Sequence, residues 1–399
     1  MFLAMSMIPV GGMRAAAQSP DGEIRMGIFG PFTGVSAEIA NQMGNGSLLA
    51  IEQANADGIV LQGKKYRIRP IMGDTEGKPE VGLSVTEKLL NVDKIDMAVG
   101  FIWSHVFLRV QDMFQDAKVP VINAGSTLGY TGTIKKRLDY VFQISPRSTD
   151  IAQAVAEAVH HHVKPKRVAF LNENTDGGRA FGQFFVEWFK KNAPEVAIVY
   201  NEYLPQGTTE FTPELTKIKA SRADVVIGEV LGAGSSAFVT QWYQLKVPAL
   251  MVSMGGTQGQ SDFLNQHKKE MQLAIVNNRW WPGKFTEVSA AMYADYKKRF
   301  GQDPTSFSVQ GYDAALVAIQ AVRTAGTLER QKLRDTLATQ TVTTVWGERH
   351  FTPLSEGQTA PVDMVVVQIQ EGKKVPIWPL GLMKDEQATF IAPPPWPWQ

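Results

Sequence analysis

The chain has 399 residues, 40 Lys and Arg against 39 Asp and Glu, and no cysteine. This length is too great for one ordinary hydrophobic core and favours two domains of roughly 150 to 200 residues each. The net charge of +1 provides no long-range field toward nucleic acid or an anionic membrane, so we expect a small molecule or another protein as partner. The lack of cysteine excludes disulfides, thiolate metal ligands and a cysteine nucleophile.

The N-terminus predicts an export signal. An apolar stretch, "FLAMSMIPVGG" (2–12), precedes "AAAQ" (15–18), whose small residues suit cleavage after Ala17. The stretch lacks the basic residues that normally come before the apolar segment, so a buried N-terminal helix is the alternative. We therefore expect a signal peptide over residues 1–17 and a periplasmic location. No later run of about 18 apolar residues predicts a membrane span.

From Ile24 onward, short β-rich runs alternate with amphipathic helical stretches, which is the pattern of a parallel sheet covered by helices. The fold class is therefore α/β. The alternation restarts after 139–146, which indicates two similar units in tandem. In chain order we expect strands at 24–29, 66–74, 95–100, 119–123, 167–172, 196–203, 224–230 and 249–254, and helices at 45–58, 80–91, 105–117, 149–162, around 181–188 and 212–221.

The last third of the chain does not predict a third domain, because 273–345 and 346–380 are each too short to bury a good core. We expect these segments to complete the two lobes. The first lobe would combine 21–145 with 278–345, and the second would combine 146–277 with 346–380. The chain would then cross between the lobes near 145, 278 and 346, and the Pro-rich 381–399 would form an extended tail.

Two hydroxyl-bearing loops follow neighbouring strands of the first predicted sheet. Ser104, in "VGFIWSHVF" (99–107), stands where the N-cap of the next helix belongs, and Thr127 lies in "NAGSTLG" (123–129). Ligands of open parallel sheets bind at the carboxyl ends of the strands. The two hydroxyls, the backbone N–H groups near Gly125 to Thr127 and the helix N-terminus would suit a carboxylate. The alternative is that Ser104 is only a cap and Thr127 only a turn residue.

The adjacent Ser104 and His105 also raise the hypothesis of a serine hydrolase. A neighbour in a helix points about 100 degrees away, and the serine lacks the G-x-S-x-G nucleophile elbow. We therefore expect His105 to take no part in the site. The run His160 to His162 does not predict a metal site, because three consecutive helical residues cannot face one ion. "GIFGPFTG" (27–34) matches neither nucleotide-binding motif.

Near the second crossover, "NNRWWPGKF" (277–285) places Arg279, Trp280 and Trp281 together. A tryptophan here is either buried in a core or part of an aromatic wall in the cleft. The second possibility would favour an apolar or aromatic ligand body.

Segments spread along the chain resemble the Leu/Ile/Val-binding protein family, the periplasmic binding proteins of ABC importers. The resemblance runs from about 24 to 370 and lies in many weak matches in the right order. These are "IRMGIFGPFTGVSAEIANQMGNGSLLAIEQANADG", "GDTEGKPEVGLSVTEKLL", "VPVINAGST", "YVFQISP", "EFTPELTKIKAS" and "GYDAALVAIQAVRTAG". It implies two Rossmann-like lobes with parallel central sheets, joined by three crossovers, with ligand in the interlobe cleft (periplasmic binding protein type I). It also implies that Ser104, Gly125 and Thr127 hold the ligand carboxylate.

The sequence departs from the family pattern at several site positions. Trp103 stands where amino-acid binders often carry a disulfide cysteine, and Gly177 stands at about the place of a second-lobe aromatic residue. The acid that commonly holds the ligand ammonium is replaced by Met254, although Glu229 is near enough to take over. These departures put amino acids in doubt as ligands. The expected ligand-binding residues are Trp103, Ser104, Gly125, Ser126, Thr127, Gly177, Glu229, Met254 and Trp280.

The resemblance implies an exported substrate-binding protein that captures a small carboxylate, either an amino acid or an aromatic or apolar acid. Lobe closure would trap the ligand for delivery to the membrane subunits of an ABC permease. We expect a monomer that is not an enzyme, has no cofactor or metal and binds no nucleic acid. The alternatives are a ligand-sensing receptor of the same fold that feeds a regulator, and a serine hydrolase.

Overall fold

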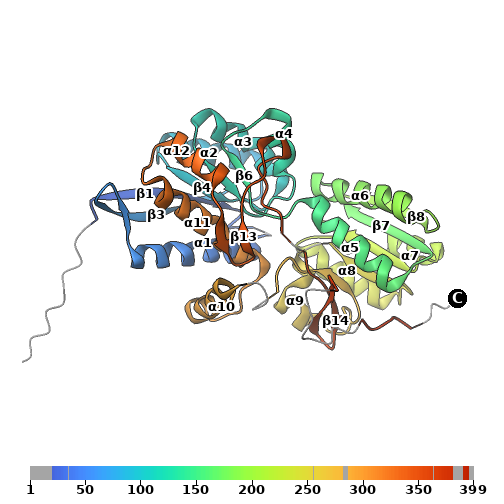
Figure 1. The fold of residues 1–399 in the computed structure, drawn as a ribbon. Coiled ribbons are helices and arrows are strands. Elements are labelled where there is room, and N and C mark those ends of the chain that lie inside the picture. The colour runs from blue at the N-terminus through green and yellow to red at the C-terminus, as the bar shows by residue number, and fades with distance from the viewer. Residues whose placement is uncertain are drawn as a thin grey trace, which may run out of the picture.

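A computed structural model describes residues 20–34, 36–254, 256–281, 286–362, 364–380 and 390–394. Figure 1 shows two lobes, each built on a sheet that is covered by helices. The predicted signal peptide lies outside the described residues, as does most of the predicted tail. The architecture is the α/β fold with two sheets that the alternation of strands and helices predicted.

The first lobe is built on a six-stranded sheet in the order β2-β3-β1-β4-β5-β6. All neighbours in it are parallel except β2 and β3. Its strands are β1 (Gly22–Gly30), β2 (Ile59–Leu61), β3 (Lys64–Asp74), β4 (Met97–Gly100), β5 (Val121–Asn123) and β6 (Val141–Gln143).

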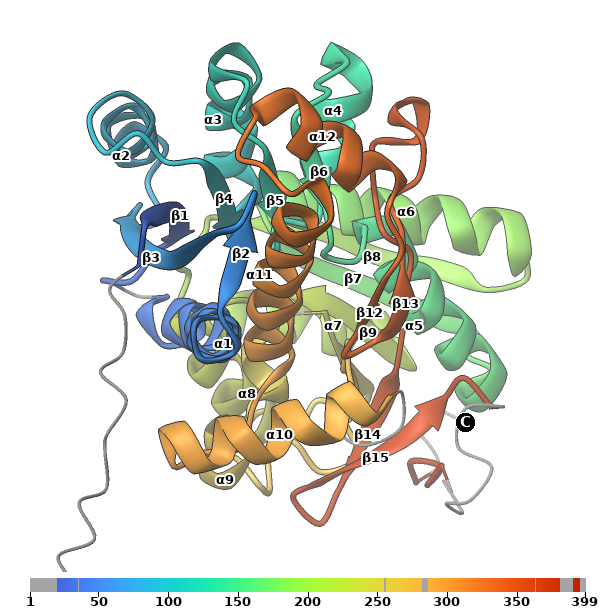
Figure 2. The same cartoon turned by 60° about the vertical axis from the view of Figure 1, so that its left-hand side comes forward.

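Helices cover both faces of this sheet. One face packs against α1 (Ala37–Asp57) and α11 (Ser306–Ala325), which lie side by side in Figure 2, together with α10 (Glu287–Phe300) and α12 (Arg330–Thr339). The other face packs against α2 (Pro79–Asn91) and α3 (Ser104–Ala117). Because both faces are covered, β4, β5 and β6 are buried throughout, which explains why they are mostly apolar. The short α4 (Gly129–Lys136) links β5 to β6.

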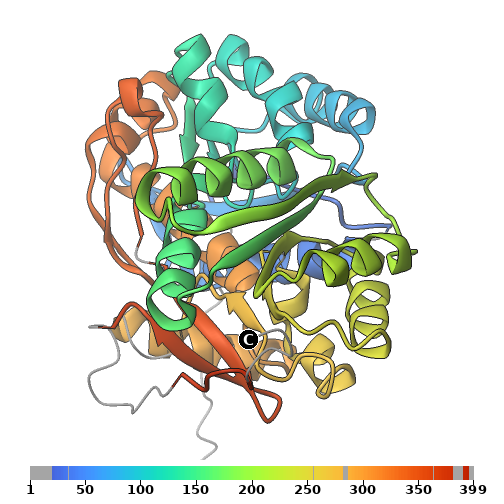
Figure 3. The ribbon, with the colours of Figure 1, turned by 90° about the vertical axis from the view of Figure 1, so that its right-hand side faces the viewer.

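The second lobe, which faces the viewer in Figure 3, has a seven-stranded sheet in the order β15-β14-β11-β10-β9-β7-β8. Strands β7 to β11 are parallel, and β14 and β15 add an antiparallel edge. The strands are β7 (Arg167–Glu173), β8 (Ala197–Leu204), β9 (Val225–Glu229), β10 (Leu250–Ser253), β11 (Ile275–Asn277), β14 (Val366–Gln370) and β15 (Lys373–Trp378). The helices are α5 (Ser148–Val163) and α6 (Asp176–Asn192) on one face, and α7 (Thr212–Ser221), α8 (Ala233–Gln244) and α9 (Ser261–Gln266) toward the other.

The third crossover comes later in the chain than the sequence predicted. The hairpin of β12 (Val342–Thr344) and β13 (Gly347–Arg349) stays with the first lobe, where Trp346, Phe351 and Ala360 join its core. Thr359 also bridges to Gln143 in β6. The expected start of the last second-lobe segment at residue 346 is therefore wrong, because the large apolar side chains that follow it are buried in the first lobe.

Two side chains tie the three crossovers together. The Arg349 guanidinium donates to the carbonyl oxygens of Ile144, at the first crossover, and Ala360, at the third. Trp346 Nε1 donates to the carbonyl oxygen of Arg279, at the second crossover, over 2.8 Å. The crossovers are thus held to one another by hydrogen bonds from a single hairpin.

Candidate functional site

A cavity lies between the lobes at the carboxyl ends of both sheets. The parallel strands lie in the order β3-β1-β4-β5-β6 in the first lobe and β8-β7-β9-β10-β11 in the second. In both sheets the strand order therefore reverses beside the first strand, β1 or β7, and open sheets bind ligands at such a reversal. The cavity lining consists of Ile39, Ile102, Trp103, Ser104, His105, Gly125, Thr127, Thr175, Gly177, Glu229, Leu231, Gly256, Thr257, Arg279 and Phe307.

The loop after β4 presents the first-lobe part of this lining. Gly100 and Phe101 both have positive φ, at 119° and 65°, and a side chain at Gly100 would overlap the carbonyl oxygen of Phe29. The Phe101 ring stacks on the Phe29 ring at 4.7 Å between centroids. A buried aromatic pair thus anchors this left-handed turn, which delivers the next residues to the cavity.

Ser104 is the first residue of α3 rather than its N-cap, which is Trp103, so the predicted capping role of Ser104 is wrong. The Trp103 side chain makes no capping hydrogen bond. The first-turn N–H groups of a helix have no carbonyl partner within it, and these lie at the cavity wall. The Ser104 hydroxyl and this helix end therefore form a neutral hydrogen-bonding surface.

Ser126 does not line the cavity, contrary to the sequence prediction. It is fully buried, and its hydroxyl donates to the Ser104 hydroxyl over 3.1 Å. Its backbone is held by Asn123, whose side-chain amide donates to the Ser126 carbonyl while the amide oxygen accepts from the Ser126 N–H. Ser126 is thus a residue that positions Ser104.

Gly125 and Thr127 reach the cavity from the loop after β5. A Cβ at Gly125 would lie 2.6 Å from the Met43 methyl group and 2.6 Å from the Phe101 carbonyl oxygen. Only glycine therefore lets this loop approach the loop after β4 so closely. The close approach brings the hydroxyls of Ser104 and Thr127 to the same wall.

Trp103 and His105 lie side by side at the edge of this wall, with ring centroids 5.9 Å apart. His105 does line the cavity, contrary to the expectation that it would point away. Its Nε2 is 3.0 Å from the Gly77 carbonyl oxygen, which can only accept. That nitrogen is therefore occupied and is not directed at Ser104.

The second-lobe wall begins at the N-terminus of α6. Thr175 caps this helix by accepting from the Gly178 N–H over 3.0 Å. Gly177 lies in the first turn, and a Cβ there would be 3.5 Å from Glu229 Oε2. The absence of a side chain at Gly177 thus leaves room in front of the Glu229 carboxyl group.

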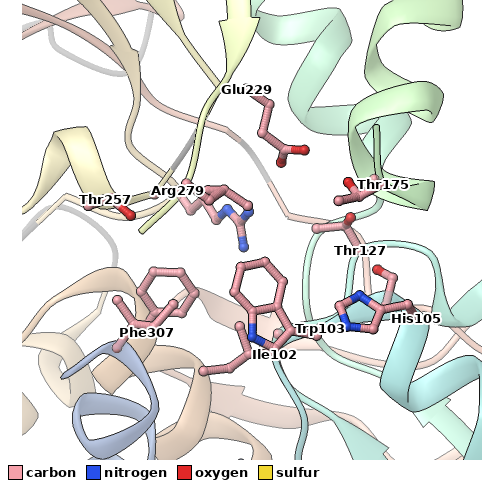
Figure 4. A pocket seen from close by; sticks show the side chains of 15 residues that line it. Ile102, Trp103, His105, Thr127, Thr175, Glu229, Thr257, Arg279 and Phe307 are labelled. Atoms are coloured by element: carbon pink, nitrogen blue, oxygen red, sulfur yellow. The ribbon is translucent and has the colours of Figure 1, made fainter. Parts of the chain in front are cut away.

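Two buried ionisable groups from the second lobe and its crossover enter the cavity (Figure 4). Burial, and then the neighbouring Glu173, raise the pKa of Glu229 to about 8, against the opposing effect of Arg279. Burial lowers the pKa of Arg279 to about 10, against the opposing effect of Glu229. Glu229 is therefore mostly protonated at neutral pH, whereas Arg279 is charged.

Met254 and Trp280, which the sequence predicted as ligand-binding residues, do not line this cavity. Met254 is buried in the second-lobe core, and Gly256 and Thr257 line the cavity in its place. Trp280 is buried in the first-lobe core, where its Nε1 donates to Ser289 Oγ over 3.3 Å. In the extended chain after β11 successive side chains alternate, so Arg279 faces the cavity and Trp280 faces the core.

Arg279 was visible in the sequence beside Trp280 but was not predicted as a site residue. The signal that could have identified it is this period-two alternation beyond a buried strand. Thr175 and Thr257 follow β7 and β10, so the rule of strand carboxyl ends could have found them as well. Phe307 comes from α11, far along the chain, and no sequence signal places it here.

Within the part of the chain that the structure describes, no three or more His, Cys, Asp or Glu side chains are grouped to hold a metal ion. His160, His161 and His162 lie in the last turn of α5, and His162 Nε2 contacts the Ile377 carbonyl oxygen at 2.8 Å. No helix among the described residues is both long enough and apolar enough to cross a membrane.

Comparison with known proteins agrees with this architecture. The chain matches the profile of the periplasmic binding proteins over residues 23–374. The chain belongs to the periplasmic binding protein family. It is similar to a Leu/Ile/Val-binding protein homolog of Brucella abortus (strain 2308), with 24% identity over 398 residues, covering 93% of this chain and 95% of the relative. The resemblance found in the sequence is thereby confirmed.

Solved structures share the fold of this periplasmic binding protein. The branched-chain amino acid transporter substrate-binding protein LivJ of Streptococcus pneumoniae, in complex with isoleucine, matches with a TM-score of 0.79 and 21% identity, covering 88% of this chain and 97% of that one. A solute-binding protein of an R. palustris ABC transporter, in complex with benzoate, matches with a TM-score of 0.78 and 18% identity, covering 89% and 95%. These likenesses establish the type I periplasmic binding protein fold.

The site of this periplasmic binding protein also argues against a hydrolase. The Ser104 hydroxyl accepts from Ser126, and His105 Nε2 is bonded to the Gly77 carbonyl. A nucleophilic serine needs a base within hydrogen-bond reach of its hydroxyl, and His105 does not supply one. In line with its relatives, the chain is a solute-binding protein and not an enzyme.

Proposed function

We propose that the chain is the exported substrate-binding protein of an ABC importer and that it captures a small carboxylate in the cavity between its lobes. The observation that carries the proposal is the first-lobe wall, where Ser104, Thr127 and the N-terminus of α3 meet. Hydroxyl and backbone donors at a helix N-terminus stabilise an anion without a charged side chain.

The remaining walls suit a flat or apolar ligand body. Trp103 and Phe307 supply aromatic surface, and Ile39, Ile102 and Leu231 supply aliphatic surface. The lining comes from both lobes, so closure around a ligand would bury it from two sides. The solved neighbours named above bind isoleucine and benzoate, both of which carry one carboxylate.

Delivery to a permease follows from the same proposal. A membrane subunit that contacts both lobes would meet a surface that changes when the lobes close. Capture in the periplasm requires the export signal that the N-terminal sequence predicts.

A thermal-shift screen tests the proposal. Amino acids, aliphatic acids and aromatic acids are each added to the purified chain at 1 to 5 mM, with the corresponding primary amides as matched controls. A bound acid raises the unfolding temperature by mass action, and we expect the shift for an acid and not for its amide. Equal shifts for acids and their amides would contradict a carboxylate anchor.

A further inference from the structure

The Arg279 guanidinium stands in the cavity without a partner for one of its nitrogens. Arg279 is 8% exposed, and its buried Nη1 makes no hydrogen bond with any residue that the structure describes. In Figure 4 the guanidinium points to the middle of the cavity, between Glu229 and Trp103. A buried charge without a counterion is costly, so a ligand atom that accepts from this nitrogen would offset that cost.

The protein itself fixes the position of this group. The Arg279 carbonyl oxygen accepts from Trp346 Nε1. The guanidinium carbon of Arg279, Cζ, lies 5.7 Å from the centre of the Phe307 ring. No ion pair joins Arg279 to any carboxylate among the described residues. The backbone of Arg279 is therefore fixed by a hydrogen bond, its guanidinium lies against an aromatic ring, and its charge is left for a ligand.

The acidic groups nearby do not balance that charge at neutral pH. Glu229 has a pKa of about 8, and burial also raises the pKa of Glu173 behind it. Each has one oxygen, Oε2, that finds no hydrogen-bond partner among the described residues. A protonated Glu229 can donate to an acceptor, and an ammonium group placed here would meet a cation and a neutral acid.

We propose that the site selects acids that carry, besides the carboxylate held by the first lobe, a second oxygen-bearing group and no ammonium, and that Arg279 binds this second group. This inference rests on the proposed function. The second group must contain an oxygen that accepts a hydrogen bond from Arg279, as a second carboxylate or a ketone does. A monocarboxylate with a purely apolar body would leave the guanidinium unpaired.

Calorimetry with two matched pairs of probes tests the selection. The first pair is 4-methyl-2-oxopentanoate and leucine, which share a skeleton and differ in a ketone against an ammonium. The second is terephthalate and 4-(aminomethyl)benzoate, with benzoate as the reference for a single carboxylate. We expect the ammonium-free member of at least one pair to bind at least tenfold tighter than its partner.

Variants of Arg279 assign the preference to this side chain. Arg279→Gln should remove most of the preference within the pair, and Arg279→Lys, which keeps the charge, should retain part of it. Thermal unfolding of each variant checks the fold, and if Arg279→Gln does not fold, Arg279→Lys and the selectivity of the unaltered chain decide. Tighter or equal binding of the ammonium member in both pairs, or an unchanged preference in a folded Arg279→Gln, would overturn the inference.

Ser104→Ala separates failure of this inference from failure of the proposed function. If the probes bind, are weakened by Ser104→Ala and show no preference, only the inference about Arg279 is wrong. If no probe binds, or if Ser104→Ala leaves every affinity unchanged, the carboxylate anchor is wrong and the inference falls with it.

Discussion

The two walls of the cavity use different chemistry to face the same ligand space. The first-lobe wall offers neutral donors, the hydroxyls of Ser104 and Thr127 and a helix N-terminus. The second-lobe wall holds the buried ionisable groups Glu229 and Arg279. Neutral donors keep the same state over a wide pH range, whereas the state of the opposite wall depends on a carboxyl that titrates near pH 8.

This difference suggests a division of work within one site. The first wall suits the group that all candidate ligands share, a carboxylate, and its geometry depends on close packing of two loops. The second wall suits the group in which candidate ligands differ. Changes on the first wall should therefore affect every ligand, and changes on the second should affect selectivity and pH dependence.

Gly125→Val should break the first wall most severely. Its side chain would overlap the Met43 methyl group and the Phe101 carbonyl oxygen, each 2.6 Å from the Cβ position. We expect loss of measurable acid binding by calorimetry and a stability loss of about 1 to 3 kcal/mol in urea unfolding. Gly177→Ala is the matched control, because its Cβ would be in ordinary contact at 3.5 Å from Glu229 Oε2. Equal stability losses in the two variants would contradict the packing argument.

Glu229 should make acid binding depend on pH. As pH rises through about 8 the carboxyl gains a negative charge, so affinity for an anion should fall about tenfold between pH 6 and 9. Glu229→Gln should flatten this profile, and Glu80→Gln, at an exposed position, should leave it unchanged. Calorimetry across the pH range measures both profiles. The same slope in Glu229→Gln and the unaltered chain would contradict this assignment.

The same group should affect folding stability. Its pKa is about 8 in the folded chain against the ordinary glutamate value of 4.5, so the folded state binds more protons between these values. Its contribution to stability is complete below pH 4.5 and is lost as pH rises toward 8. Urea unfolding should therefore show a smaller loss of stability over this range in Glu229→Gln than in the unaltered chain.

Ser126→Ala should have a moderate effect on the first wall. The substitution removes the hydroxyl that donates to Ser104 without removing a cavity-lining group. We expect acid affinity to fall by about 0.5 to 1.5 kcal/mol, the ordinary net value of one hydrogen bond. The loss should be smaller than that of Ser104→Ala. A larger loss would mean that Ser126 touches the ligand itself.

His105→Ala should have the smallest effect on affinity. The ring borders the cavity, but its Nε2 is engaged by the Gly77 carbonyl oxygen. We expect a change of about threefold or less in the dissociation constant, no more than the low end of the range for one ordinary hydrogen bond. A loss of tenfold or more by calorimetry would assign His105 a direct ligand contact.

Much of the fold could be predicted from the sequence because the strands are buried and apolar and the helices are amphipathic. The loops after β4 and β5 could be assigned to one edge because parallel strands bring their carboxyl ends together. The second wall was harder to predict. Whether Arg279 or Trp280 faces the cavity depends on the register of the extended chain, and a shift of one residue exchanges them. An apolar residue such as Met254 can lie either in the core or in the cavity lining, and the sequence does not distinguish the two.

The late third crossover has a similar cause. Trp346 and Phe351 are apolar enough for either lobe, and only their packing shows that they join the first. Phe307 reaches the cavity from a helix whose partners lie hundreds of positions earlier in the chain, so local patterns carry no information about it.

Calorimetry of the double variant Ser104→Ala/Thr127→Ala tests the carboxylate anchor most directly. The titrant is the acid that gives the largest thermal shift, and its primary amide serves as control. We expect each hydroxyl to contribute about 1 to 3 kcal/mol to binding of the acid, and the acid to lose its advantage over the amide in the double variant. An unchanged acid affinity in a folded double variant would show that the carboxylate is not held by the first-lobe wall.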